Sequence, residues 1–169
     1  MESRELLLNA FDNVEDAVRG AVEGIDPELL TARIGAGANT IAWLVWHLTR
    51  IQDDHVAEVA GRPQSHTEDG WVDRFALPFD AAATGYGFNA DDVAATRITD
   101  PQLLVSYHAD VHRRTAEFLQ TVTAEDLDRV VDRRWDPPVT LGVRLVSVIT
   151  DDLQHAGQAG YLRGVLERR

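Results

Sequence analysis

Cysteine and lysine are both absent from the 169-residue sequence, and methionine occurs once. Without cysteine, the chain has no thiolate nucleophile, no disulfide and no cysteine-ligated zinc or iron–sulfur site. Without lysine, it has neither Schiff-base catalysis nor a Walker-type phosphate loop. The side chains left for chemistry are histidine, aspartate, glutamate, arginine, tyrosine and the hydroxyls.

Positive charge is scarce as well, because 16 basic residues stand against 28 acidic ones and give a formal net charge of −12. This balance disfavours nucleic acid and anionic membrane surfaces as partners. No apolar run reaches the roughly 18 residues of a membrane span, and the first residues lack the basic-then-apolar pattern of a secretion signal. We therefore expect a cytoplasmic protein that acts on a small molecule, without nucleic acid or membrane as partner.

Apolar residues recur at helical spacing, and no region alternates apolar and polar residues over the length of a strand. The pattern predicts four long helices, with Ser3, Thr40 (or Asn39), Asp100 (or Thr99) and Thr140 as their N-caps, over residues 3–22, 40–60, 101–122 and 141–167. Residues 123–127 predict a short extra helix. The aromatic-rich segment 62–99 predicts an ordered crossover with short helical pieces. The expected fold is all-α: a four-helix bundle with a long crossover between helices 2 and 3, forming one domain over residues 1–169.

Asp151 and His155 are spaced i and i+4 on the predicted last helix, so their side chains share one face. His47 lies among apolar residues of the second helix, and a bundle can bring it opposite this pair. Two histidines and one carboxylate are a metal-ligand set that leaves coordination positions open. Spacing alone leaves ordinary alternatives: a buried histidine bonded to a carbonyl, and a helix-surface Asp–His pair. Asp152 should point away from Asp151, about 100° round the helix.

His108 and His112 form a second i, i+4 pair, on the predicted third helix. This is a zinc-compatible spacing, but the His-Glu-x-x-His pattern that supplies a general base is absent. A half-buried helix boundary is the alternative interpretation. His55 and His66 lie in charged, loop-like surroundings, and we expect both to be solvated.

Two further residues are candidate helpers. Arg50 lies one turn after His47 and has the chemistry to recognise a carboxylate near a metal; its alternative is an ion pair with Asp53 or Asp54. Gln158, three residues past His155, is a candidate for orienting a ligand. Trp43, Trp46, Trp71 and the segment 86–88 are expected in the core or an interface, with some lining a cleft that leads to the metal.

Three motifs point to a family: W-x-x-W-H-L at residues 43–48, D-x-x-x-H-A-G-Q at 151–158 and Y-L-R-G at 161–164. With them the sequence resembles the DinB-like superfamily, and most of all its actinobacterial branch of mycothiol-dependent isomerases and thiol transferases. The resemblance covers nearly the whole chain, including the segments GWVDRFALPFD and DPPVTLGVRLVSV.

The resemblance implies a divalent metal on His47, Asp151 and His155, with zinc first and nickel, manganese or iron as alternatives. Many members use three histidines, and mycothiol-dependent members use His, a carboxylate and His; Asp151 stands where a longer Glu is usual. The implied activity is transfer or isomerisation with mycothiol as cosubstrate, the thiol being activated on the metal. A hydrolase using metal-bound water, or a non-catalytic metal- or ligand-binding stress protein, are the alternatives. Exposed helix faces and four tryptophans also allow a homodimer.

Overall fold

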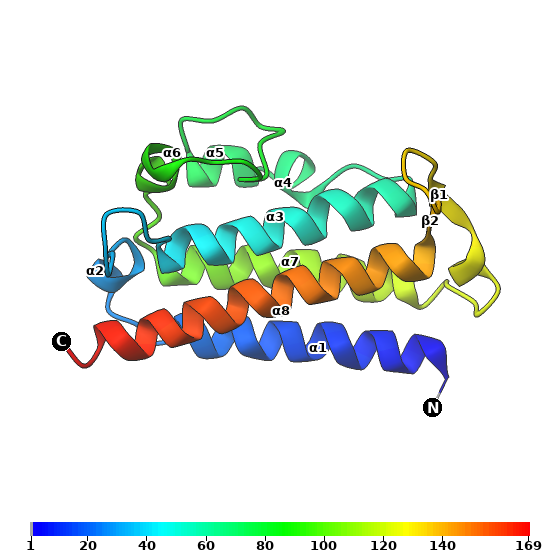
Figure 1. The fold of residues 1–169 in the computed structure, drawn as a ribbon, viewed down its shortest axis with the longest axis horizontal. Coiled ribbons are helices and arrows are strands. Elements are labelled where there is room, and N and C mark those ends of the chain that lie inside the picture. Colours follow the sequence, from blue (N-terminus) through cyan, green and yellow to red (C-terminus); the bar gives the residue numbers. More distant parts are fainter. Residues whose placement is uncertain (1) are drawn as a thin grey trace.

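Four long helices dominate the computed structural model, which describes residues 2–169 (Figure 1). They are α1 (Ser3–Val22), α3 (Ile41–Ala60), α7 (Pro101–Leu119) and α8 (Leu141–Leu166). Helix α8 packs against α1 and α3, and α7 packs against the same two helices on the other side. Because the crossover returns the chain to the starting end of the bundle, α7 runs in the same direction as α3. The all-α prediction is confirmed, apart from one small two-stranded sheet.

Most helices begin at the capping residues that the sequence predicts. The Thr40 hydroxyl accepts from the Trp43 backbone N–H at 3.1 Å, and Thr140 caps α8 in the same way. Asp100 caps α7, with proline as the first helical residue, because proline fits where no N–H partner is needed. Ser3 as N-cap is wrong: Glu2 caps α1 and forms a reciprocal capping box with Glu5.

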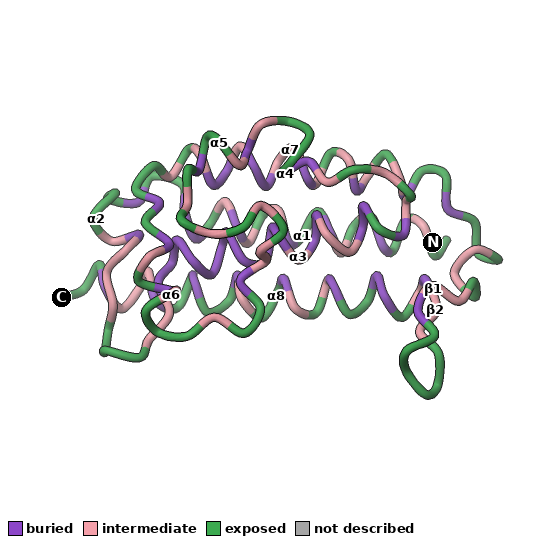
Figure 2. Tube along the Cα trace, turned by 90° about the horizontal axis from the view of Figure 1, so that it is seen from above, coloured by how far each residue is buried: buried purple, intermediate pink, exposed green. Residues whose placement is uncertain are grey.

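Helix α3 is the most buried of the long helices. Its consecutive residues 41–50 are all buried. A helix that is covered on one side only would have exposed residues on its other side. Helices α7 and α8 cover two of its sides, and the crossover covers another (Figures 1 and 2). Each fully buried aliphatic or aromatic side chain here contributes about 1.5–3 kcal/mol relative to exposure, so tertiary packing, more than capping, holds α3 in place.

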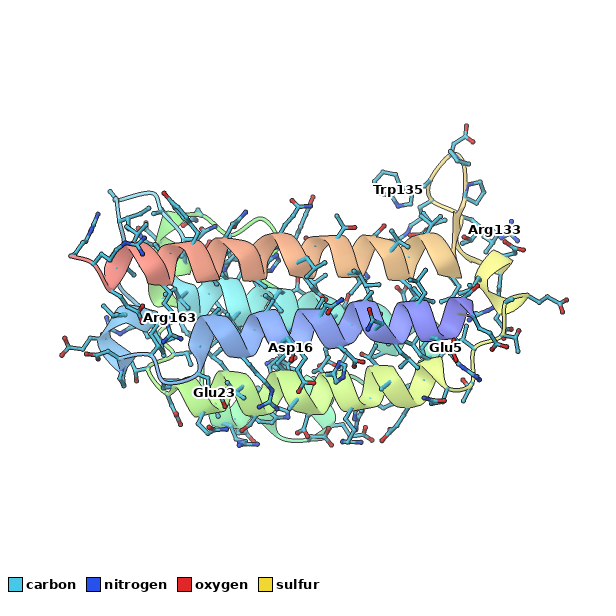
Figure 3. All side chains as sticks on the ribbon, turned by 90° about the horizontal axis from the view of Figure 1, so that it is seen from below. Glu5, Asp16, Glu23, Arg133, Trp135 and Arg163 are labelled. Atoms are coloured by element: carbon cyan, nitrogen blue, oxygen red, sulfur yellow. The ribbon has the colours of Figure 1, made fainter. Side chains whose placement is uncertain are left out.

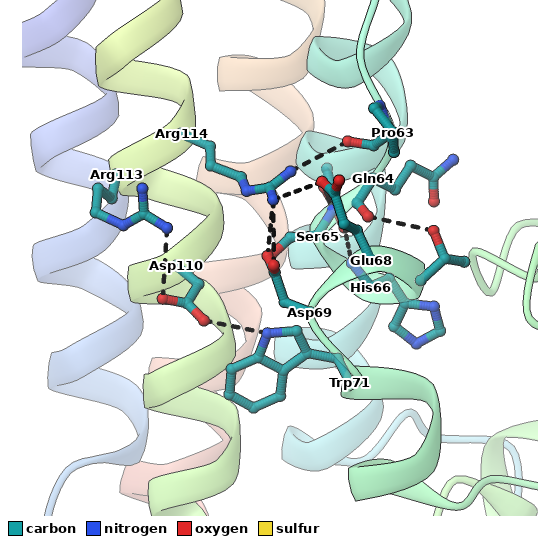
Figure 4. A network of polar contacts seen from close by, with 12 residues as sticks. Pro63, Gln64, Ser65, His66, Glu68, Asp69, Trp71, Asp110, Arg113 and Arg114 are labelled. Carbon is teal, nitrogen blue, oxygen red and sulfur yellow. Dashed lines mark hydrogen bonds and ion pairs between the residues drawn. The ribbon is translucent and has the colours of Figure 1, made fainter.

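The crossover is ordered, as predicted, and contains three short helices: α4 (Ser65–Glu68), α5 (Trp71–Phe75) and α6 (Ala90–Ala95). Its first part is fastened to α7. Arg114 on α7 donates to the Pro63 carbonyl at 3.2 Å and binds Glu68 at 2.7 Å, and the Trp71 indole donates to Asp110 at 3.2 Å (Figure 4). A shorter helix, α2 (Pro27–Leu30), lies in the connection from α1 to α3.

The link between α7 and α8 differs from the prediction. A 3-10 turn, η1 (Asp126–Asp128), replaces the expected short helix. It is followed by an antiparallel pair, β1 (Val130–Asp132) and β2 (Val139–Thr140), which the sequence analysis missed. Figure 2 shows the loop between the strands exposed and projecting from the bundle.

The structure bears on two expectations about partners, the absence of a membrane span and the homodimer. Within the described residues, no helix is long and apolar enough to cross a membrane. Exposed apolar side chains on α8, such as Val146 and Tyr161, are compatible with the homodimer, which stays a prediction.

Candidate metal centre

The structure brings His47, Asp151 and His155 together. His47 lies in the first half of α3, and the other two lie one turn apart on α8, the helix packed against it. Each residue offers a ligand atom, and these atoms lie within 4.8 Å of one another. Among the described residues, this is the only such group of three.

The His47 ring is held on two sides. Its Nδ1 lies 2.6 Å from the Thr84 carbonyl oxygen in the crossover, and because a carbonyl can only accept, Nδ1 carries the proton. Trp43 stacks on the ring, with centroids 4.7 Å apart and planes 9° apart. Nε2 is thereby left with its lone pair free for a metal. Burial lowers the pKa of His47, which favours this neutral form.

Gly85 makes the close approach of the crossover to His47 possible. Its φ is +89°, a conformation that side chains rarely adopt. A Cβ at this position would lie 2.8 Å from His47 Nδ1 and 3.1–3.2 Å from the rings of Trp46 and Trp43. Neither Thr84 nor Gly85 carries a sequence signal that links it to His47, 37 positions before Thr84.

His155 and Asp151 orient each other on α8. His155 Nδ1 donates to the Asp151 backbone carbonyl at 2.8 Å and lies 3.4 Å from the carboxylate Oδ2, so its Nε2 is also available. The interaction with this carboxylate raises the pKa of His155. Burial raises the pKa of Asp151, but His155 and nearby histidine charges outweigh it, so that the net shift is downward and the carboxylate is ionised.

The donor set fits a divalent metal. Asp151 Oδ2 is buried and makes no hydrogen bond to the part of the chain that is described, so the carboxylate has an unfilled acceptor beside two imidazoles. Imidazole nitrogen with one carboxylate is a set that zinc, nickel, manganese and iron accept. Although aspartate is shorter than the usual glutamate, Asp151 reaches the cluster, because the three ligand atoms converge within 4.8 Å.

A comparison with known families assigns the chain to one of them. The sequence profile of the mycothiol-S-transferase family, which is DinB-like, matches residues 6–168. The chain belongs to this family. The resemblance carried by the three sequence motifs is thus confirmed.

A solved structure has the same fold as this mycothiol-S-transferase family member. It is described as the crystal structure of the conserved protein of locus from Enterococcus faecalis. It is 25% identical to the chain, with a TM-score of 0.92 over 100% of this chain and 99% of that one. No curated protein matches the chain with significance.

Asp152 occupies a different face from Asp151, as predicted. It is fully buried, and neither of its carboxylate oxygens has a hydrogen-bond partner among residues 2–169. Burial raises its pKa well above the usual value, and the nearby Asp151 charge adds to this. A neutral carboxylic acid in the bundle core follows.

His108 and His112 do not converge on one point with a third ligand. His108 is buried and its Nδ1 lies 3.2 Å from the Thr49 hydroxyl. His112 turns to α1, where its Nε2 lies 3.1 Å from Asp12 and 3.4 Å from Glu15. The half-buried helix boundary is therefore the better description of this pair.

The two candidate helpers are not bonded to the ligands. Arg50 is fully buried: its Nε donates to the Ala83 carbonyl at 3.1 Å, and its Nη1 lies 3.5 Å from Asp53. These contacts support the ion-pair interpretation. Gln158 is exposed and, within the described chain, forms no hydrogen bond to Asp151 or His155.

The expectation of two solvated histidines is wrong for His66, which is buried at the start of α4 with its backbone N–H bonded to Asp53 at 2.8 Å. His55 is half-buried and accepts from Arg144 at 2.6 Å. Sequence periodicity missed both placements, because the covering segments come from the crossover and from α8.

A cleft of about 480 Å³ opens beside Asp151, the one candidate ligand that lines it. Residues of α3 and α8 form its floor, among them His55 and Arg144. Trp135 of the β1–β2 loop and Tyr86 of the crossover also line it. Tyr86 belongs to the segment 86–88, some of which was expected to line a cleft, whereas no motif in the sequence pointed to Trp135.

Proposed function

We propose that the chain transfers a low-molecular-weight thiol, mycothiol or a relative, to an electrophilic small molecule, with a divalent metal held by His47, Asp151 and His155. The convergence of these three donors in a chain without cysteine is the observation that carries the proposal. A divalent metal there would lower the pKa of a bound thiol and so supply a nucleophile at neutral pH. Zinc is the first choice, with nickel, manganese or iron as alternatives.

The chain's own residues supply position and access. Thr84 fixes the tautomer of His47, and the Asp151 backbone carbonyl does the same for His155. Three protein ligands leave coordination positions for small molecules, and the cleft beside Asp151 gives them a path. In the reaction, sulfur bonds to the electrophilic carbon, the bond to the leaving group breaks, and the thiol proton is released.

Metal content tests the centre. We expect about one equivalent in purified, tag-free protein after loading with zinc, nickel or manganese, and loss of that metal in His47→Ala and His155→Ala. His112→Ala is the matched control, because this histidine lies on another helix and contacts α1. Equal metal in wild type and both ligand variants, or none in any sample, would contradict the assignment.

Thiol dependence tests the reaction. Metal-loaded protein is incubated with mycothiol and a panel of electrophiles, and conjugate is measured by mass spectrometry with and without thiol. Conjugate formed only with thiol and only with intact ligands supports the proposal. Product formed at the same rate without thiol would identify a hydrolase, and metal binding without turnover would identify a binding protein.

A further inference from the structure

The outer face of helix α8 is exposed and carries no charge. Figures 1 and 3 show α8 as the outermost long helix on its side of the bundle. The charged residues of α8 are buried or half-buried, and Arg144 and Arg163 turn to α3 and α1. All exposed residues of Leu141–Leu166 are therefore uncharged, in a chain of which 26% is charged. A solvated helix face is normally charged or polar, so this one has the character of a contact surface.

A stripe of apolar side chains and glycines follows this face. Its residues alternate between spacings of three and four, as in a coiled-coil seam, and they are Val143, Val146, Thr150, Leu153, Gly157 and Gly160. The two valines are 53% and 56% exposed. The Thr150 hydroxyl already donates to the Val146 carbonyl at 2.8 Å, so the stripe presents no unsatisfied polar group of its own side chains.

The fold of the single chain does not require the glycines of the stripe. An added Cβ at Gly157 or Gly160 would meet nothing within 4 Å in the described chain, and neither residue has a positive φ. Glycine is a poor helix former, so two of them in the middle of an exposed helix lower its intrinsic stability without a gain in packing inside the chain. Their small size is useful only to a partner that packs on α8.

The two halves of the stripe are complementary to each other. Suppose that a second copy packs its α8 antiparallel to the first, about a twofold axis between residues 151 and 152. Val143 then lies opposite the partner's Gly160. Val146 lies opposite the partner's Gly157 in the same way, so each exposed valine meets the notch left by a glycine. A parallel pair would place valine against valine and glycine against glycine, and the gaps would lose dispersion contacts.

Charge and shape also favour a second copy in this orientation. Two chains of net charge −12 repel each other, and a face without charge lets them approach with the least repulsion. Figure 3 shows the β1–β2 loop, which carries Trp135, projecting past α8 beside its first turn. In a parallel pair the two loops would meet at one end. In an antiparallel pair each loop lies beside the last turns of the other helix.

We propose that the uncharged face of α8 is the interface of a twofold-symmetric homodimer, in which the α8 helices of two copies pack antiparallel. The stripe from Val143 to Gly160 covers 17 helical steps, about 26 Å. A contact of this length belongs to the small class of interfaces, below about 1,200 Å² in total, so we expect association at micromolar concentrations. The proposal depends neither on the metal centre nor on thiol transfer.

Sedimentation velocity of the full chain tests the interface. With rising concentration, the mass should increase from 18.7 kDa towards twice that value. Gly157→Leu fills the notch, and Leu153→Glu places a carboxylate of each copy at the centre, so each should raise the dimer Kd more than about tenfold. Gly157→Leu should do so without lowering the Tm, because the position is open within the chain and leucine favours a helix.

Matched controls lie on α1. Gly20 is exposed and equally open, and Leu6 is 59% exposed, so Gly20→Leu and Leu6→Glu should keep the wild-type Kd. A monomer at every concentration, or dimers that Gly157→Leu and Leu153→Glu leave intact, would overturn the proposal. Added salt should strengthen the dimer, because it screens the repulsion between two acidic copies. Weakening by salt would indicate ion pairs at a different face and would also overturn it.

Disulfide trapping tests the orientation, since the chain has no cysteine of its own. A mixture of Val146→Cys and Gly157→Cys should cross-link when an oxidant is added, because the two positions lie opposite each other. Val146→Cys alone should not, since its two copies would be offset by 11 residues, about 16 Å along the helices, which is beyond the reach of a disulfide. Cross-linking of Val146→Cys with itself, and not with Gly157→Cys, would contradict the antiparallel arrangement.

Discussion

Gly85 offers a sharp test of how the crossover positions His47 in the candidate metal centre, through the substitution Gly85→Ala. The added methyl would meet His47 Nδ1 at 2.8 Å, a distance that real Cβ contacts do not show. The imidazole cannot retreat freely, because Trp43 stacks against it with centroids 4.7 Å apart. Either the ring turns, or Thr84 moves and loses its 2.6 Å hydrogen bond from His47.

Two costs follow, and they are separable. Placing alanine at positive φ costs about 1–2 kcal/mol of folding free energy. Disturbing the carbonyl that orients a ligand histidine lowers metal affinity by about 10–100-fold, which is about 1.4–2.8 kcal/mol of binding free energy. The first cost concerns any glycine at positive φ, whereas the second requires contact with His47.

Gly87 is the matched control, since its φ is +76° and a Cβ there meets nothing within 4 Å. We expect both substitutions to lower the free energy of unfolding of the metal-free protein, measured in urea, and Gly85→Ala to lower it more, because only its methyl meets His47. Competition with a chromophoric chelator should show weakened zinc binding for Gly85→Ala alone. Wild-type affinity in Gly85→Ala would refute the idea that the crossover positions His47.

Further predictions concern the buried polar groups. Burial, with smaller effects of nearby charges, lowers the pKa of His108 to about 3. Below about pH 6.5, the unfolded chain therefore binds a proton at this histidine that the folded chain does not bind. Stability should therefore fall as the pH drops from 6.5 towards 3, by about 2 kcal/mol at pH 5 from this group. His108→Gln should flatten that part of the curve of unfolding free energy against pH, and an unchanged slope would contradict the assignment. Arg50→Leu removes the charge beside buried Asp53 and should cost about 3 kcal/mol of stability, measured by urea unfolding. Its metal content should stay at the wild-type level, and loss of metal at full stability would instead place Arg50 at the centre.

Much of the bundle could be predicted because its signals are local. Thr40, Thr140 and the Asp100–Pro101 pair mark helix starts by their own chemistry. The β1–β2 pair could not be predicted in this way. Its strands have three and two residues, too few for an alternating pattern to be recognised, and their pairing is decided by the packing of α8 and the 3-10 turn.

In the candidate metal centre, too, the parts with local sequence signals could be predicted and the others could not. Asp151 and His155 share a face by spacing alone, His47 lies among apolar residues of a helix that a bundle brings opposite them, and the family motifs support all three. Thr84 and Gly85, which hold His47, lie in a crossover without periodicity, and their approach depends on how that segment packs over α3. Local patterns therefore predicted the three candidate ligands and missed the groups that orient them.

The candidate metal ligands and the walls of the cleft lie on different kinds of element. His47, Asp151 and His155 are carried by α3 and α8, two long helices packed against each other, so their mutual geometry is set by the bundle core. Trp135 and Tyr86 are carried by loops, where substitutions cost little stability. Changes in the β1–β2 loop should therefore alter which thiol binds without altering which metal binds. Candidate ligands on packed helices, with cleft walls on loops, would let one bundle keep its chemistry while its cosubstrate changes.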